Sequence, residues 1–130
     1  MILLDTHIWV WWMTASTQLT ARHQHLLNVH QSSGLGVSII SCWEVAKLVE
    51  IGRIGFTLPV LDWLQQAIAH PALKLLDLNP EIAVASTQLP PPFHRDPADQ
   101  IIVASARHYG LPLLTADTRI LAYPHVTVLR

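Results

Sequence analysis

The stretch Ile2-Leu3-Leu4-Asp5-Thr6 predicts both the fold and the place of its chemistry. An uninterrupted apolar run is typical of a strand buried on both faces of a parallel sheet, and here the run ends in a carboxylate and a hydroxyl. In open α/β sheets, ligands bind beyond the carboxyl ends of the strands. Asp5 therefore stands where a catalytic or metal-binding acid is expected, although an Asp at this position is also a common helix N-cap.

Apolar runs and helical patterns alternate along the rest of the chain. The expected later strands cover residues 35–40, 73–78, 111–115 and 126–129, and the expected helices cover residues 7–13, 21–30, 42–51, 58–70, 80–88 and 97–109. This alternation predicts a parallel sheet with right-handed crossovers and helices on both faces. We expect one α/β domain over residues 1–130, with a central, mainly parallel sheet of about four or five strands.

The composition predicts a chain whose surface is partly covered by another chain. Hydrophobic residues make up 51% of the sequence and charged residues 13%, against a usual charged share of about 25%. We therefore expect a homodimer or another protein partner. The single cysteine, Cys42, excludes an intramolecular disulfide and fits a reducing cytoplasm. No apolar run approaches the roughly 20 residues of a membrane span, and we expect no signal peptide.

Four acids from distant parts of the chain are predicted to meet at one rim of the sheet. Asp5 and Asp117 follow strands, whereas Glu44 and Asp99 stand in the first turns of helices that begin at the same edge. Clustered carboxylates repel one another unless a cation lies between them, and oxygen-only ligands suit Mg²⁺ or Mn²⁺. Such a metal activates water and neutralises charge on a phosphoryl group. The sequence thus favours metal-dependent hydrolysis of phosphodiesters.

Each of these acids also has a structural explanation that must be weighed. Ser41-x-x-Glu44 has the form of a capping box, in which the glutamate bonds back to the N-cap amide. Asp96 precedes Pro97 and can cap the helix that follows, and Asp99 can interact favourably with the dipole of the same helix. Gly110 is a standard stop for that helix. These structural roles explain each acid singly, but they explain the presence of all four acids at one rim less well.

Four segments resemble the acidic motifs of PIN domains, and most closely those of the VapC-type ribonuclease toxins of bacterial toxin–antitoxin pairs. The segments occur in the family's order and at plausible spacing, and they span the whole chain. Each motif alone is a weak indicator of the family, and the set of four is a strong one. They are Ile2-Leu3-Leu4-Asp5-Thr6, Ser41-Cys42-Trp43-Glu44-Val45-Ala46, Asp96-Pro97-Ala98-Asp99-Gln100-Ile101-Ile102-Val103-Ala104-Ser105-Ala106 and Leu113-Leu114-Thr115-Ala116-Asp117.

The resemblance implies a three-layer α/β/α fold and a role for each matching residue. The family's invariant acids match Asp5, Glu44 and Asp99, and its more variable fourth acid matches Asp117. Asp99 is preferred over Asp96 because it immediately precedes the apolar helix, as the family's acid does. The supporting hydroxyls and a possible outer residue match Thr6, Thr115 and Asp96.

The resemblance further implies an activity and partners. The expected activity is Mg²⁺- or Mn²⁺-dependent cleavage of structured RNA such as tRNA or rRNA, and single-stranded loops are the favoured sites. A homodimer and a VapB-like antitoxin are expected, with the antitoxin's C-terminal segment lying along an apolar groove and placing a basic side chain among the acids. Because the net charge is −1, phosphate contacts must come from local basic groups. The candidates are Arg22, Arg53, Arg95, Arg107 and Arg119.

Other classes fit the sequence less well. A phosphotransferase of the haloacid dehalogenase type needs a second Asp two residues after the first, where this chain has His7. A receiver-like phosphoacceptor needs an acidic pair and a later lysine after a strand, and neither is evident. A non-catalytic binding module that keeps the fold, or a phosphohydrolase acting on another phosphate ester, stays open as an alternative. The intact set of four acids argues against the module.

Overall fold

A computed structural model describes the whole chain, residues 1–130, as a five-stranded sheet with helices on both sides. The strands lie in the order β3-β2-β1-β4-β5, and every neighbouring pair is parallel. Their bounds are β1 (Ile2–Leu4), β2 (Leu35–Ser38), β3 (Leu73–Leu76), β4 (Leu113–Leu114) and β5 (Val128–Leu129). The helices are α1 (Thr6–Met13), α2 (Ala21–His30), α3 (Ile39–Glu50), α4 (Val60–Ile68), α5 (Pro80–Ser86), α6 (Pro97–Tyr109) and α7 (Thr118–Leu121), with a 3₁₀ turn, η1, at Gln31–Ser33.

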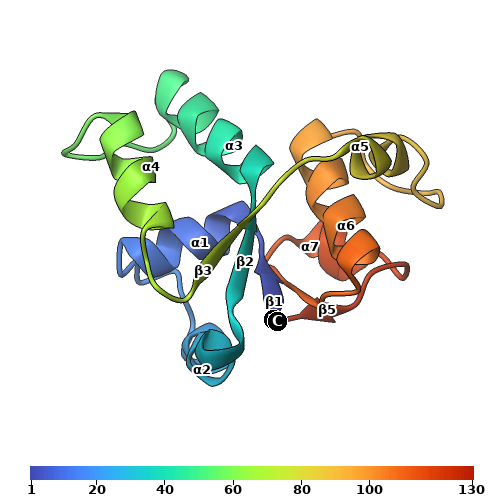
Figure 1. Cartoon of the computed structure of the whole chain (residues 1–130), viewed down its shortest axis with the longest axis horizontal. Helices are drawn as coiled ribbons and strands as arrows, with labels where there is room; N and C mark the ends of the chain where they lie inside the picture. The colour runs from blue at the N-terminus through green and yellow to red at the C-terminus, as the bar shows by residue number, and fades with distance from the viewer.

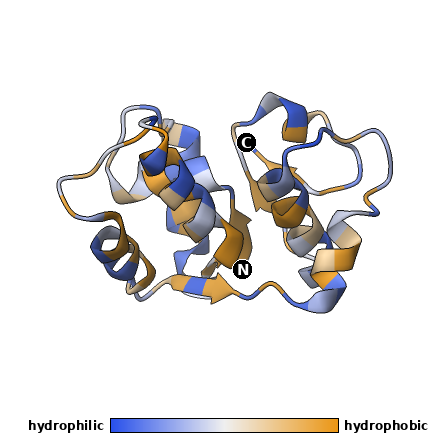
Figure 2. Cartoon of the chain, turned by 90° about the horizontal axis from the view of Figure 1, so that it is seen from above, coloured by the Kyte–Doolittle hydropathy of each residue, from blue (hydrophilic) through white to orange (hydrophobic).

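The first strand divides the interior into two cores. Ile2 and Leu4 point into a core shared with α1, α2, α3 and α4, whereas Leu3 points into a second core shared with α6 and α7. This alternation follows from the two-residue side-chain period of a strand. Figures 1 and 2 show the two groups of helices on either side of the strands. The predicted three-layer α/β/α fold with a parallel sheet is confirmed.

The strand order reverses direction between β1 and β4. The chain moves from β1 outward to β2 and β3, then returns through α5 and α6 to β4 on the other side of β1. In open α/β sheets, a ligand binds beyond the carboxyl ends of strands at the point where the order reverses. Asp5 directly follows β1 and Thr115 directly follows β4, so both lie at this point.

Several helix ends follow local signals in the sequence. The Asn79 side chain accepts a hydrogen bond of 2.8 Å from the Ile82 amide and caps α5. Asp96 caps α6 by accepting a 3.1 Å bond from the Asp99 amide. Gly110 ends α6 with φ 63° and ψ 36°, a left-handed conformation that costs glycine little. These predicted helix ends are confirmed.

The predicted boundary between β2 and α3 is wrong. The β-branched pair Ile39-Ile40 favours a strand to residue 40, but the Ser38 hydroxyl accepts a 3.2 Å bond from the Ile40 amide and caps a helix that begins at Ile39. Ser41 is therefore inside the helix, and the predicted Ser41–Glu44 capping box does not form. Glu44 lies in the second turn of α3, not in the first.

The remaining strands are also shorter than predicted. β3 ends at Leu76, β4 comprises only Leu113–Leu114, and β5 only Val128–Leu129. Apolar sequence next to β4 and β5 also lines the second core, whereas Leu78 after β3 is exposed, so composition alone cannot mark where pairing stops. Trp9 is fully buried, whereas Trp11 and Trp12 are half-buried. None of the helices is both long enough and apolar enough to cross a membrane.

Candidate active site

The Asp5 carboxylate, at the point between β1 and β4 where the strand order reverses, is held by two hydrogen bonds. Its Oδ1 accepts a 2.8 Å hydrogen bond from the Thr6 amide, and its Oδ2 accepts a 2.7 Å bond from the Thr115 hydroxyl. The residue is 3% exposed. Burial raises the pKa of Asp5, and the hydrogen bond from Thr115 acts in the opposite direction. Both supporting hydroxyl residues that the sequence singled out lie next to this acid, and Thr6 also bonds to the Ser41 hydroxyl at 2.8 Å.

Glu44 reaches the same place from the second turn of α3 and lacks a partner. Its Oε1 atom is buried and makes no hydrogen bond to the protein. The pKa of Glu44 is raised to about 6, chiefly by burial and also by the nearby charges of Asp5 and Asp99, while the Thr6 hydroxyl opposes the shift. A buried acceptor without a partner costs free energy. A bound cation would supply what this oxygen lacks.

Asp99 lies in the first turn of α6 and is 6% exposed. His94, from the proline-rich connector before α6, approaches it closely, with Nε2 at 2.6 Å from Asp99 Oδ2. Burial raises the pKa of Asp99 to about 6, whereas the hydrogen bond with His94 opposes the shift. This carboxyl is therefore hydrogen-bonded to a histidine that the sequence analysis did not select.

The acids form one group, and Asp96 belongs to it. Glu44, Asp96 and Asp99 each offer a carboxylate oxygen, and these oxygens lie within 4.8 Å of one another. Asp5 acts on the pKa of both Glu44 and Asp99, so its charge adds to the same repulsion. Asp96 caps α6 and also faces the cluster, near the acids, where the sequence analysis had kept it as a possible outer residue. An oxygen-only donor set with uncompensated charge fits Mg²⁺ or Mn²⁺.

Asp117 lies at the edge of this group and has a cationic partner. It caps α7 by accepting bonds from the amides of Arg119 and Ile120, at 2.8 and 3.3 Å. Arg119 Nη2 lies 3.1 Å from Asp117 Oδ2 and 3.5 Å from Asp99 Oδ2. Burial alone would raise the pKa of Asp117, but the hydrogen bonds from the Arg119 side chain and from the two amides outweigh burial and lower the pKa.

The five arginines proposed as phosphate contacts occupy different places. Only Arg119 is in contact with the acids. Arg95 is exposed in the connector, between His94 and Asp96. Arg107 is in the last turn of α6 and donates to the carbonyl of His125. Arg22, on α2, and Arg53, after α3, are exposed and form no ion pair.

His94 is the site residue that sequence reasoning missed. It lies in the stretch Leu89-Pro90-Pro91-Pro92-Phe93-His94-Arg95, which carries no helix or strand period. A histidine in such a connector is usually a surface residue. The only local signal was its position shortly before Asp96 and Asp99, and this could not show that its ring turns back toward the acids.

An α/β/α fold with carboxylates gathered where the strand order reverses places this chain among the α/β proteins whose site is built from acidic side chains. A model of the PIN domain family matches residues 2–126, and the chain belongs to that family. The family inferred from the four acidic motifs is thereby confirmed. Among curated relatives, Ribonuclease VapC22 of Mycobacterium tuberculosis is 35% identical over 124 residues, which cover 95% of this chain and 92% of the relative.

Solved structures of low sequence identity share the fold. A chain of the VapBC2 structure from Rickettsia felis, bound to a DNA fragment from its promoter, has a TM-score of 0.72 and 15% identity and covers 99% of this chain and 98% of its own. A chain of a toxin–antitoxin complex from Klebsiella pneumoniae has a TM-score of 0.67 and 18% identity, with coverage of 100% and 97%. At these identities the likeness concerns the architecture.

Proposed function

We propose that this protein is a metal-dependent endoribonuclease and the toxin of a toxin–antitoxin pair. The observation that carries the proposal is the buried, unpartnered Glu44 Oε1 within a cluster of acids. The likeness to Ribonuclease VapC22 over nearly the whole chain supports RNA as the substrate. The site of such an enzyme must hold a divalent cation, and this cluster has the charge and the oxygen donors for one.

The proposed ligands are Asp5, Glu44 and Asp99, with Asp117 at the edge and Asp96 beside them. A bound Mg²⁺ or Mn²⁺ would activate a water molecule and reduce the negative charge of the scissile phosphate. The hydroxyl of Thr115 and the amide of Thr6 fix both oxygens of Asp5, so this carboxylate needs little reorganisation to bind. Arg119 presents an exposed guanidinium next to the acids, where it can bind an RNA phosphate.

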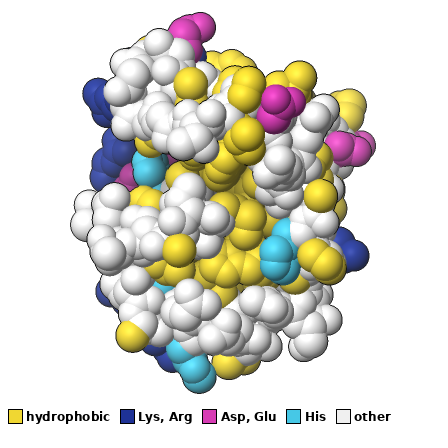
Figure 3. Space-filling view, turned by 90° about the vertical axis from the view of Figure 1, so that its left-hand side faces the viewer, with side chains coloured by type: hydrophobic (Ala, Val, Ile, Leu, Met, Phe, Trp, Pro, Cys, Tyr) yellow, Lys and Arg dark blue, Asp and Glu magenta, His cyan; other side chains and the backbone are white.

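The proposed antitoxin site is the apolar groove on the α1 side of the molecule. A groove of about 310 Å³ runs between α1 and the segment after α3, with His7 at its lining. Its apolar members are Val10, Trp11, Leu48, Ile54 and Phe56. Figure 3 shows hydrophobic side chains gathered on the side of the molecule that carries α1 and α4. His7 is two residues from Asp5, so a segment lying in the groove could place a basic side chain near the acids.

We also propose a homodimer and a cytoplasmic location. Exposed apolar side chains remain on the helices, including Trp43 on α3, Leu61 on α4 and Val84 on α5, at 53%, 62% and 54% exposure. Covering such groups with a second copy would remove apolar surface from water. Light scattering at tens of micromolar should give the mass of a dimer, and a monomer at that concentration would contradict the proposal. The cytoplasm holds the RNA that such an enzyme cuts.

The test of the proposed activity is RNA cleavage by the purified chain. The wild type should cut total cellular RNA in Mn²⁺ or Mg²⁺, lose cleavage in EDTA, and recover it when metal is restored. Asp5→Asn should be inactive, whereas Asp62→Asn, the same change at an exposed acid of α4 outside the cluster, serves as the matched control. Metal binding without cleavage of any RNA would favour the non-catalytic module. Cleavage of small phosphate esters but not of RNA would favour the other phosphohydrolase.

A further inference from the structure

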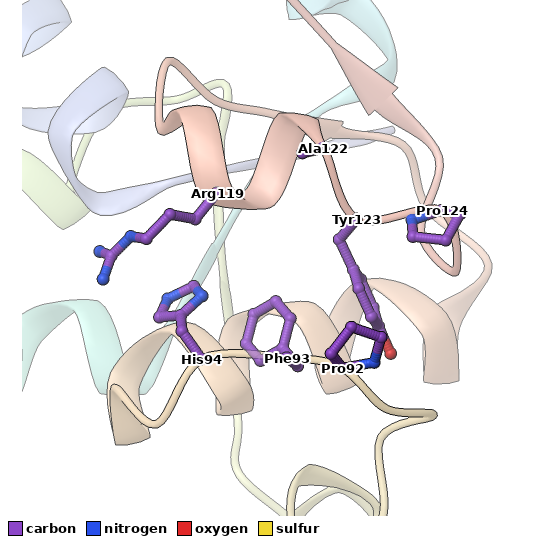
Figure 4. Close-up of a pocket in the computed structure, with 7 residues that line it drawn as sticks. All are labelled: Pro92, Phe93, His94, Arg119, Ala122, Tyr123 and Pro124. Atoms are coloured by element: carbon purple, nitrogen blue, oxygen red, sulfur yellow. The ribbon is translucent and has the colours of Figure 1, made fainter.

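A cavity of about 420 Å³ lies next to the acids, between α7 and the proline-rich connector. Its volume falls within the range of about 300–1,000 Å³ found for small-ligand sites. In Figure 4, Phe93 and Pro92 line the connector side, Tyr123 closes one end, and Arg119 and His94 stand at the other. The cavity thus has an apolar, aromatic end and a cationic end.

The cationic end of the cavity joins the acid cluster directly. His94 and Arg119 line the cavity, and both also approach Asp99 Oδ2, at 2.6 Å and 3.5 Å. A group in the cavity is therefore separated from the acids by only these two side chains. A phosphate at the acids would place a neighbouring nucleotide of the same strand at the mouth of the cavity.

The aromatic end is fixed by the surrounding structure. The Tyr123 hydroxyl donates a 2.7 Å hydrogen bond to the Pro90 carbonyl, which ties the end of α7 to the connector. Tyr123 meets Phe93 edge-to-face with ring centroids 4.7 Å apart, and Phe93 lies 4.3 Å from the His94 ring. Tyr123 is buried, whereas Phe93 is half-buried. The Phe93 ring is therefore held in place while still partly accessible.

We propose that this cavity is a subsite for one unstacked base of a single-stranded RNA, held against Phe93 while Arg119 binds the adjoining phosphate. The inference rests on the proposed ribonuclease function and extends it to substrate positioning. Proteins that bind single-stranded RNA stack bases on aromatic rings and on arginine planes. The combination of one partly accessible ring, one exposed guanidinium and a cavity that adjoins the acids across His94 and Arg119 provides both contacts. Stacking tolerates any base, so this subsite favours unpaired over paired RNA.

The experiment measures RNA binding separately from cleavage. Full-length Asp5→Asn protein in Mg²⁺ is titrated against a fluorescein-labelled, unstructured 12-nucleotide RNA of mixed sequence, and binding is followed by anisotropy. Adding Phe93→Ala should weaken binding about tenfold, the size expected for losing one stacked base. Phe93→Leu, which keeps apolar packing without a ring, should lose as much, and Phe93→Trp should restore binding. Tyr109→Ala, an exposed aromatic at the far end of α6, is the matched control and should bind as its parent.

The second part of the experiment removes a base from the RNA, whereas the first part removes the Phe93 ring from the protein. RNAs with one abasic ribose at successive positions should include one that binds the parent about tenfold more weakly, and this loss should vanish in the Phe93→Leu background. Equal binding by parent and Phe93→Leu, or an abasic penalty that persists in Phe93→Leu, would overturn the subsite. Wild-type RNA cleavage with Phe93-independent binding would refute the subsite alone. Phe93-dependent binding without any wild-type cleavage would refute the proposed function alone.

Discussion

Glu44 and Asp117 are both carboxylates at the carboxyl edge of the sheet, yet their surroundings act on their charges in opposite directions. Glu44 is partly buried, has an oxygen without a partner, and has a pKa raised to about 6 by burial and by neighbouring acids. Asp117 accepts hydrogen bonds from two amides and from Arg119, and these bonds lower its pKa. The negative charge of the carboxylate is thus balanced by hydrogen bonds and a cation at Asp117, whereas it is not balanced at Glu44.

This difference indicates where a cation is needed. Buried carboxylates in close proximity cost free energy unless a positive charge lies among them. On the Asp117 side, Arg119 already supplies that charge. On the side of Glu44, Asp96 and Asp99, the basic side chains of His94 and Arg119 both approach the same acid, Asp99, and neither Glu44 nor Asp96 forms an ion pair. We therefore assign the metal to the Glu44 side and give Asp117 and Arg119 a role at its edge.

The largest expected effect separates Glu44 from Asp117 in catalysis. Glu44→Gln should lower RNA cleavage by more than about 100-fold, because it removes a ligand, whereas Asp117→Asn should lower it by about tenfold, as for an outer partner. Without metal, Glu44→Gln should keep or slightly raise the melting temperature, because it removes a partly buried charge that carries an unpartnered oxygen. Cleavage rates and thermal melts of both variants are the measurement. Equal losses would mean that the two acids play equal parts.

A second comparison divides Asp96 from Asp99 at the start of α6. Asp99→Asn should lower cleavage by more than about 100-fold. Asp96→Asn should lower it by less than about tenfold, and its stability should change by much less than the roughly 1 kcal/mol of a lost cap, because Asn also caps well. Paired melts and cleavage rates at saturating Mg²⁺ provide the test. If Asp96→Asn is inactive and Asp99→Asn is active, the roles assigned to these two acids are reversed.

The raised pKa values predict how stability varies with pH. Glu44 and Asp99 have pKa values of about 6 in the folded chain, against ordinary values of 4.5 and 3.8. The folded state therefore holds these protons more tightly than the unfolded state, so their stabilisation is present below about pH 4 and is lost as the pH rises through 6. Without metal, the melting temperature should fall over this window.

Metal should reverse that trend, because it binds the deprotonated carboxylates. Stabilisation by Mn²⁺ should be small at pH 5 and should grow by pH 7, reaching about 2.7 kcal/mol where the metal is at 100 times its Kd. Differential scanning fluorimetry at pH 5, 6 and 7 with Mn²⁺ or with EDTA measures both trends. In Glu44→Gln both slopes should be shallower. A metal-induced shift that is the same at pH 5 and pH 7 would contradict the assignment of these pKa values to the site.

The smallest expected effect concerns Arg119. Because its guanidinium is exposed, Arg119→Ala should change stability little. Removing a positive charge 3.5 Å from Asp99 should slightly tighten Mn²⁺ binding, and losing a phosphate contact should raise the KM for RNA. Calorimetry and steady-state cleavage would detect these opposite changes. Weaker Mn²⁺ binding in Arg119→Ala would show that the arginine supports the metal site rather than limiting it.

Sequence patterns predicted the sheet edge well because the chemistry follows buried strands. Asp5 and Asp117 were placed by the apolar runs before them, and Asp99 by the Asp96-Pro97 start and Gly110 stop of α6. Glu44 was placed at the correct edge of the sheet, but on the wrong assumption that Ser41 caps α3 and that Glu44 lies in its first turn. Ser38, not Ser41, caps α3, and tertiary packing overrode the strand propensity of Ile39 and Ile40.

The contacts between distant segments could not be read from the sequence. His94 reaches Asp99 because the connector folds back over the start of α6, and the pairing of Thr115 with Asp5 joins residues 110 positions apart. Neither contact has a local period or spacing. Asp96 posed a similar difficulty, since its use as a cap gave no sign that it also faces Glu44.

We propose that the acids on the Glu44 side, whose negative charges lack enough positive partners, hold a divalent metal. Isothermal titration of Mn²⁺ into the wild type, Glu44→Gln and Asp117→Asn at pH 7.5 tests it most directly. We expect clear Mn²⁺ binding by the wild type, at least about tenfold weaker binding by Glu44→Gln, and a smaller loss of affinity in Asp117→Asn. Glu44→Gln that binds Mn²⁺ as tightly as the wild type would contradict it.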